Sequence, residues 1–207
     1  GDQIVGVSAF SDVPAEAKRK PSVGDYSRPN IEKILSLRPT LIFGLREGID
    51  TYSGSLRQAN AAVLLVDLRT LEDYPLAVLK IGAALGRQSE ASALAREWTS
   101  AWQRIPKSTA SHRVLIQVDQ SPLIVAGRGT FLHEIITRCG HINVNENREG
   151  YPQIQSEVLA ARKPDLVLIT VHGESSTQKS AENFWKNQKL FTRPRVILAD
   201  PNEVSRL

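Results

Sequence analysis

A short unit of helix, proline and strand occurs twice in this chain, and it constrains the fold more than any other sequence feature. The first copy is Pro29–Gly44, PNIEKILSLRPTLIFG, and the second is Pro152–Thr170, PQIQSEVLAARKPDLVLIT. Each has a basic residue followed by proline, which ends the helix before an apolar strand. A unit used twice predicts two similarly built lobes, with chance similarity as the alternative.

Short apolar runs rich in β-branched residues recur along the chain and predict its strands. Each run is nearly continuous and is bounded by polar residues, glycine or proline, as in strands that are buried on both faces. Helical stretches separate most of them, so the pattern predicts an α/β fold with parallel sheets. The runs are Ile4–Val7, Leu41–Phe43, Val63–Val66, Val114–Ile116, Leu166–Ile169 and Val196–Leu198.

The stretch between the two units predicts a long helix. From Leu71 to Ile105 an apolar stripe with helical spacing includes Trp98 and Trp102, which we interpret as core packing. Gly82 and Gly86 are the positions where the helix would bend or break. We therefore expect an N-terminal lobe at 1–68, an inter-lobe helix at 69–107 that acts as a rigid brace, and a C-terminal lobe at 108–207.

Composition excludes several classes of protein. The chain has 207 residues, 41% of them hydrophobic and 23% charged, which is typical of a globular protein rather than a disordered one. The formal net charge of +4 comes from scattered residues, so nucleic-acid binding is disfavoured. No apolar run approaches the roughly 20 residues of a membrane helix. The lone Cys139 is expected to be a packed thiol.

Motifs for catalysis or metal binding are missing. His133-Glu134 does not begin an HExxH motif, because position 137 is threonine, and the histidines lack metal-ligand spacing. No GxSxG or GxxxxGK[ST] motif occurs. The turn Gly127–Thr130 follows a strand and opens a helix, where its N–H groups could hold an anion, but it lacks GxGxxG spacing. We expect no catalytic residues and no metal or other cofactor, with an enzyme as the weaker hypothesis.

Aromatic and polar residues cluster instead where strands end or helices begin. Ligands of parallel α/β sheets bind outside the carboxyl ends of the strands. Two tyrosines, one in each expected lobe, offer flat faces for a large planar ligand. The residues of this kind are Tyr26, Leu45, Arg46, Tyr151, His172 and Asp200.

Two long segments resemble the lobes of periplasmic binding proteins of the vitamin B12, iron-siderophore and haem class. SAFSDVPAEAKRKPSVGDYSRPNIEKILSLRPTLIFG resembles the N-terminal lobe, and GRGTFLHEIITRCGHINVNENREGYPQIQSEVLAARKPDLVLIT resembles the C-terminal one. The resemblance implies the class III architecture: two Rossmann-like lobes joined by a rigid helix, with the ligand in the cleft. It further implies a periplasmic or lipid-anchored monomer that delivers its ligand to an ABC transporter permease.

Within the class, the chain most resembles the cobalamin-binding members, which implies roles for individual residues. Tyr26 and Tyr151 match cleft aromatics on the two lobes. Leu45 stands where those members have a stacking tryptophan, so that contact surface is lost. Ile124 lies near the position of a cleft phenylalanine, and Asp200 near an aspartate that touches the corrin side chains.

The resemblance also implies a permease-docking role for acidic residues. Glu157 matches an acid that docks onto permease arginines, while the N-lobe position is Thr51, with Glu47 and Asp50 close by. Class members have a strand and helix before Gly1 and a helix after Leu207. Because the sequence also contains no methionine, we expect a processed or trimmed chain.

Three other ligand classes stay open on the sequence alone. Haem is one, because Tyr26-Ser27-Arg28 resembles the Tyr-x-Arg of haem-binding members, in which the phenolate ligates iron. A ferric siderophore would favour several cleft arginines, for which Arg28 and Arg46 are available. A nucleotide-using α/β enzyme would employ the turn at Gly127, and Gly129→Ala would weaken its nucleotide binding.

Overall fold

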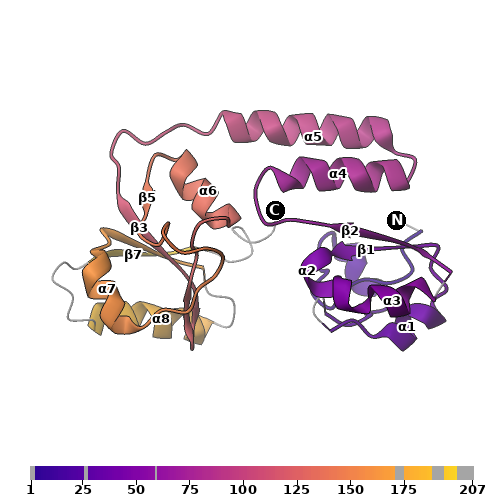
Figure 1. Cartoon of the computed structure of the whole chain (residues 1–207), viewed down its shortest axis with the longest axis horizontal. Helices are drawn as coiled ribbons and strands as arrows, with labels where there is room; N and C mark the ends of the chain where they lie inside the picture. Colours follow the sequence, from indigo (N-terminus) through magenta and orange to yellow (C-terminus); the bar gives the residue numbers. More distant parts are fainter. Residues whose placement is uncertain (1–2, 26–27, 59, 171–174, 188–193, 200–207) are drawn as a thin grey trace. The chain divides into compact units, whose positions relative to one another are not determined.

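The computed structural model describes residues 3–25, 28–58, 60–170, 175–187 and 194–199. The chain divides into two compact units: unit 1 is Gly1–Leu68 with Asp73–Glu97, and unit 2 is Arg69–Glu72 with Trp98–Leu207. Figure 1 traces the elements of each unit along the sequence. No helix within the described residues is both long enough and apolar enough to cross a membrane.

Unit 1 contains a parallel pair of strands, β1 and β2, among its described residues. Leu41 of β1 lies opposite Ala62 of β2, and Leu45 lies opposite Val66, so both strands end at the same edge. Leu56 and Val66, the last residue of β2, are both buried. The elements are η1 Ala15–Arg19, α1 Ile31–Ser36, β1 Leu41–Leu45, α2 Arg46–Ile49, η2 Asp50–Tyr52, α3 Ser53–Arg57 and β2 Ala62–Val66.

The predicted strand at Ile4–Val7 does not form, and this corrects the sequence interpretation. Val7 makes an isolated parallel bridge to Ser22, while Ile4 and Val5 are 46% and 43% exposed. A run of apolar residues becomes a strand only where a second strand supplies hydrogen-bond partners along its length. Within the described part of the chain, Ile4 and Val5 have no strand beside them.

The stretch expected to be one continuous helix contains two. Helix α4 covers Asp73–Ala84 and helix α5 covers Gln88–Gln103, so 69–107 is largely helical but interrupted. The break falls at Gly86, whose φ of +68° suits glycine and ends a helix readily. Helix α5 begins among the residues of unit 1 and ends among those of unit 2.

Unit 2 is built on a mostly parallel sheet in the order β4-β3-β6-β7, with β5 pairing to the start of β3. The hairpin strand β4 runs antiparallel to β3, whereas β5, β6 and β7 pair in parallel with their neighbours. The elements are β3 Arg113–Gln120, β4 Leu123–Val125, α6 Phe131–Arg138, β5 Ile142–Asn143, α7 Ser156–Arg162, β6 Leu166–Ile169, α8 Ser175–Asn187 and β7 Arg195–Leu198.

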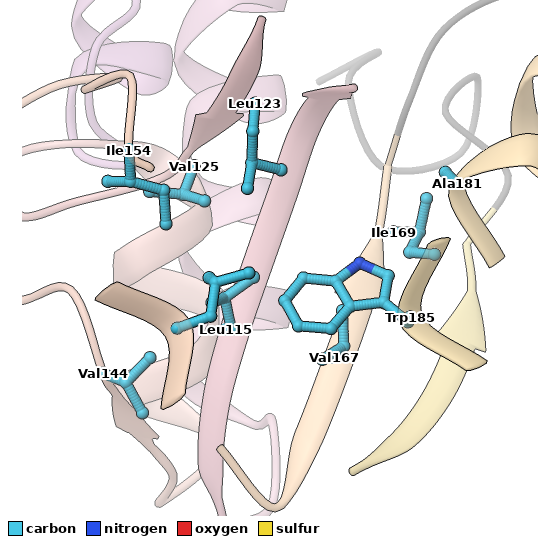
Figure 2. Packing of buried hydrophobic residues seen from close by; sticks show 10 residues of the cluster. Leu115, Leu123, Val125, Val144, Ile154, Val167, Ile169, Ala181 and Trp185 are labelled. Atoms are coloured by element: carbon cyan, nitrogen blue, oxygen red, sulfur yellow. The ribbon is translucent and has the colours of Figure 1, made fainter. Parts of the chain in front are cut away.

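The two faces of the unit 2 sheet carry separate hydrophobic clusters. On one face Leu115 and Val167 pack with Leu159 of α7 and Trp185 of α8. Figure 2 shows the Trp185 indole lying over Val167 and beside Leu115. On the other face Val114 and Ile116 pack against α6. Alternate residues of β3 thus point to opposite faces, as the two-residue period of a strand requires.

Both copies of the repeated helix-proline-strand unit adopt the predicted structure. Helix α1 leads into β1, and helix α7 leads into β6. The basic residue before each proline has a left-handed backbone, with φ of +46° at Arg38 and +45° at Lys163. The same unusual conformation at matching positions shows that the similarity of the two segments extends to the geometry of the turn.

An aromatic stack joins the ends of two helices within unit 2. The rings of Trp98 and Trp102 lie 6.2 Å apart at 23°, and the guanidinium of Arg138 lies 5.9 Å from the Trp102 ring centre. Arg138 Nη2 also donates to the carbonyl of Gln103 at 2.8 Å. Both tryptophans are half-buried and belong to neither hydrophobic cluster of unit 2, so the predicted core packing is corrected to a stack at a partly open surface. Cys139 caps α6 and is likewise only half-buried.

A buried glutamine links the sheet to α8. Gln117 is fully buried in β3, and its Oε1 accepts a hydrogen bond of 2.5 Å from Trp185 Nε1, while its Nε2 donates to Gln120 Oε1. The Gln117 carbonyl accepts from the hydroxyl of Thr170 at 3.0 Å. These bonds satisfy a polar group in an apolar core and tie the carboxyl ends of β3 and β6 together.

Replacing Gly82 by alanine should destabilise the protein, although alanine is the better helix former. A Cβ at Gly82 would collide with the Cβ of Ala91, which forces α4 and α5 apart. We expect a loss of about 1–3 kcal/mol in the free energy of unfolding, measured by denaturant titration. Gly54→Ala in α3 is the control, because nothing lies within 4 Å of its added Cβ; that variant should be unchanged or more stable. Equal changes in the free energy of unfolding for Gly82→Ala and Gly54→Ala would contradict close packing at Gly82.

Trp185→Phe should cost about 1–3 kcal/mol of stability beyond the loss of packed volume, since it leaves Gln117 Oε1 buried without its donor. The double variant Trp185→Phe, Gln117→Leu should recover part of that loss, because both partners are then apolar. Thermal and chemical unfolding of four proteins tests this: wild type, Trp185→Phe, Gln117→Leu and the double variant. If the stability losses of the two single variants add up to the loss in the double variant, the hydrogen bond contributes nothing.

Candidate functional site

In unit 1, two of the predicted ligand residues lie where β1 and β2 end. Leu45 is half-buried and pairs with Val66. The next residues, Arg46 and Asp67, form an ion pair with Arg46 Nε 3.2 Å from Asp67 Oδ1. Because both side chains are partly exposed, the pair adds little stability, but it holds the guanidinium across the two strand ends.

A tight turn carries the next predicted residue of unit 1, Arg28. Gly24 and Pro29 form an antiparallel bridge that closes the turn. Asp25 Oδ1 accepts a hydrogen bond of 2.7 Å from the backbone N–H of Arg28. Arg28 as a residue is exposed. Tyr26, predicted as a ligand residue, lies outside the described residues.

In unit 2 the segment that follows Tyr151 pairs with β4, the strand that contains Ile124. Ile124 of β4 forms an antiparallel bridge with Gln153, and Val125 N donates to the carbonyl of Pro152 at 3.1 Å. Tyr151 is thereby fixed beside β4, and it is 46% exposed although it is a large aromatic residue. The positive φ of Gly150, +69°, lets the chain turn into this position. His172 and Asp200 lie outside the described residues.

Two N–H groups of the glycine turn at Gly127–Thr130 already donate to backbone carbonyls of another segment. Gly127 N donates to the Gly150 carbonyl at 2.8 Å, and Arg128 N donates to the Arg148 carbonyl at 2.7 Å. The Thr130 hydroxyl donates to the Gly127 carbonyl and caps α6 by accepting from His133 N. These N–H groups are therefore not directed at an anion, which argues against the nucleotide-binding alternative.

The acidic residues predicted to dock onto a permease lie on separate, exposed elements. Glu157 is in the first turn of α7, where a carboxylate complements the helix dipole. Glu47 is in the first turn of α2, and Asp50 opens η2; both are exposed. All three side chains are thus exposed at the surface of their units. Among the described residues, no three histidine, cysteine or acidic side chains converge on a metal site.

Sequence reasoning missed Gln117 as a residue that shapes this region. The signal was present, since a single glutamine interrupts the apolar run of β3. A polar residue in a strand that is buried on both faces must find partners, and here those partners fix the ends of β3 and β6. Thr170, the last described residue before position 175, is one of them.

Comparison with known proteins identifies the family. Residues 1–194 match the periplasmic binding protein family. The vitamin B12-binding protein of Pectobacterium carotovorum subsp. carotovorum (strain PC1) is 28% identical over 226 residues, which cover 100% of this chain and 81% of that protein. An uncharacterized ABC transporter substrate-binding lipoprotein of Bacillus subtilis (strain 168), YvrC, is 25% identical and is matched over 68% of its length by the whole of this chain.

The fold agrees with this assignment. A periplasmic haem-binding protein from Pseudomonas aeruginosa superimposes with a TM-score of 0.79 and 27% identity, covering 95% of this chain and 76% of that one. The paired helix-proline-strand units, the mostly parallel sheet of unit 2 and the family match over nearly the whole sequence point the same way. The chain therefore belongs to the periplasmic binding protein family.

Proposed function

We propose that this protein is the substrate-binding component of an ABC importer and that its ligand is a corrinoid. The whole-chain similarity to a vitamin B12-binding protein is the observation that carries the proposal. Ligand capture and handover to a permease need no bond chemistry, which accords with a family of binding proteins. Membership implies an extracytoplasmic location, and we propose the periplasm and a monomeric state.

The geometry of Tyr151 supports a large, partly apolar ligand. An aromatic ring that is 46% exposed leaves much apolar surface in water. The backbone hydrogen bonds between β4 and the segment that follows Tyr151 hold it in place, so little conformational entropy is lost on binding. Ile124 lies in the strand that pairs with this segment. We assign both residues, with Tyr26, Arg28, Leu45, Arg46, His172 and Asp200, to ligand contacts.

Haem is the second candidate ligand. The haem-binding protein of Pseudomonas aeruginosa shares 27% of its sequence with this chain over a common fold. In this alternative Tyr26 would ligate iron, and the exposed Arg28 would pair with an acidic substituent. A ferric siderophore receives less support, because Arg46 is already paired with Asp67 and offers less unbalanced positive charge.

We expect the full-length mature protein to bind cyanocobalamin tightly at one to one in titration calorimetry, with haemin and a ferric siderophore run alongside. Tyr151→Ala should weaken binding about tenfold through loss of an aromatic contact, whereas Tyr151→Phe should retain most of the affinity. If the protein bound haemin but showed no binding of cobalamin, the importer role would stand and the ligand would change. No binding of any of the three ligands would overturn the proposal.

The permease-docking role of Glu157 gives a separate prediction. Glu157→Gln should slow uptake by the reconstituted importer several-fold while ligand affinity stays unchanged, since the acid contacts the permease rather than the ligand. Glu146→Gln is the matched control, because Glu146 is also an exposed acid of unit 2. ATP-driven uptake into proteoliposomes is the measurement, with Glu47→Gln and Asp50→Asn as the pair for unit 1. Equal uptake for Glu157→Gln and wild type would exclude the role.

A further inference from the structure

Basic residues that are scattered in the sequence come together along one edge of unit 2. Strands β3, β6 and β7 pair in parallel, so they begin at the same edge of the sheet. There Arg195 N donates to the Asp165 carbonyl at 2.9 Å, and Asp165 N donates to the Arg113 carbonyl at 2.8 Å. The Arg113 guanidinium donates to the carbonyls of Arg162 and Lys163 at the end of α7.

Two further segments extend this edge to the end of α6. Arg138 Nη2 donates at 2.8 Å to the carbonyl of the residue before Arg104. The residue after Lys107 donates its N–H to the Cys139 carbonyl at 2.8 Å, and the first residue of β5 donates to the carbonyl of the residue before β3 at 2.9 Å. We call this surface the basic edge, and its charged residues are Arg104, Lys107, Arg113, Arg138, Lys163, Asp165 and Arg195.

The basic edge accounts for the positive net charge of the protein. It contains six of the 26 lysine and arginine residues but one of the 22 acidic residues. The 20 basic and 21 acidic residues that remain nearly cancel. Unit 2 therefore has a local excess of positive charge along this edge, which attracts anionic surfaces.

The fold itself uses only part of this charge. Arg113 and Arg138 each donate to carbonyls where a helix ends, which satisfies acceptors that have no partner within the helix. Among the described residues, the other four basic side chains have no hydrogen-bond or ion-pair partner, and all four residues are exposed. We call them the unpaired cations, and they are Arg104, Lys107, Lys163 and Arg195.

We propose that the basic edge binds the surface of an anionic lipid bilayer. Its cations are spread over several strand and helix ends, and such a spread matches an array of phosphate headgroups rather than one small anion. An importer component works beside the membrane that holds the permease, so this surface is within its reach. The inference rests on the proposed function and adds a second binding surface to it.

The basic edge lies at the opposite end of α7 from the proposed docking residue Glu157. Glu157 is in the first turn of this helix and Lys163 directly follows its last residue, so roughly 10 Å of helix separates them. The carboxyl ends of β3, β6 and β7 likewise lie at the other edge of the sheet. A bilayer-bound protein thus keeps those strand ends free for ligand, and it leaves the bilayer before Glu157 meets the permease.

Cosedimentation of the full-length mature protein with lipid vesicles tests the proposal. Wild type should bind vesicles of phosphatidylcholine that contain about 30% phosphatidylglycerol, and it should not bind phosphatidylcholine alone. Raising the salt from about 0.1 M to about 1 M should release it, because the screening length falls to roughly 3 Å. Equal binding to the two kinds of vesicle would overturn the proposal.

Two variants with the same net charge separate the basic edge from charge in general. Replacing the four unpaired cations by glutamine should weaken vesicle binding more than about a hundredfold, since each contributes roughly fivefold. The matched control replaces four exposed cations of unit 1 by glutamine and should bind within about twofold of wild type: Lys33→Gln, Arg57→Gln, Lys80→Gln and Arg96→Gln. Both variants should melt like wild type, because the residues are exposed. Equal losses of binding would overturn the role of the basic edge.

Cys139 reports whether the basic edge is the surface in contact. It is the only cysteine of the chain, it is half-buried, and it follows Arg138. Its reaction with a bulky maleimide should slow several-fold on anionic vesicles and stay unchanged with phosphatidylcholine alone. Bound protein that reacts at the free rate would place the contact elsewhere and overturn the proposal.

Two more outcomes separate this inference from the proposed function. Wild type that binds cyanocobalamin but no anionic vesicles would overturn the inference alone, and so would binding of a single-stranded oligonucleotide in place of vesicles. Vesicle binding through the basic edge, in a protein that binds none of the three candidate ligands, would support the bilayer surface and overturn the proposed function.

Discussion

Strand β3 is the element on which unit 2 depends, because it pairs with three other strands. Residues 114–117 are fully buried, and β3 forms ladders with β4, β5 and β6. Its apolar side chains anchor a cluster on each face of the sheet, so α6 is held on one side and α7 and α8 on the other. The hairpin to β4 is what places Ile124 and, through backbone bonds, Tyr151.

The elements that sequence predicts best are those with a strong local cause. Proline after a basic residue ends α1 and α7, and the strand follows at once because its residues are apolar and β-branched. Where the outcome depends on partners distant in sequence, prediction was less successful. Ile4–Val7 has strand composition without a neighbouring strand along its length, and the helix at 69–107 breaks at Gly86, which was one of two possible places.

The candidate site shows the same limit. The pairing of β4 with the segment after Tyr151 depends on hydrogen bonds between parts of the chain nearly 30 residues apart, and no local pattern reveals it. The sequence of the glycine turn suggests an anion site, but the N–H groups of Gly127 and Arg128 donate to the backbone carbonyls of Gly150 and Arg148. Arg46 was predicted as a ligand contact from its place after a strand, but its pairing with Asp67 needed the register of β1 and β2.

The distribution of tryptophan means that indole fluorescence comes from only one of the two units. All three tryptophans, Trp98, Trp102 and Trp185, belong to unit 2, and unit 1 has none. Fluorescence excited at the red edge of indole absorption therefore reports on unit 2 and not on unit 1. Trp185 is buried, whereas the stacked Trp98 and Trp102 are half-buried. A quencher in solution should therefore reduce the emission of Trp98 and Trp102 before that of Trp185. A melt followed by fluorescence and by backbone dichroism would coincide only if the two units unfold together.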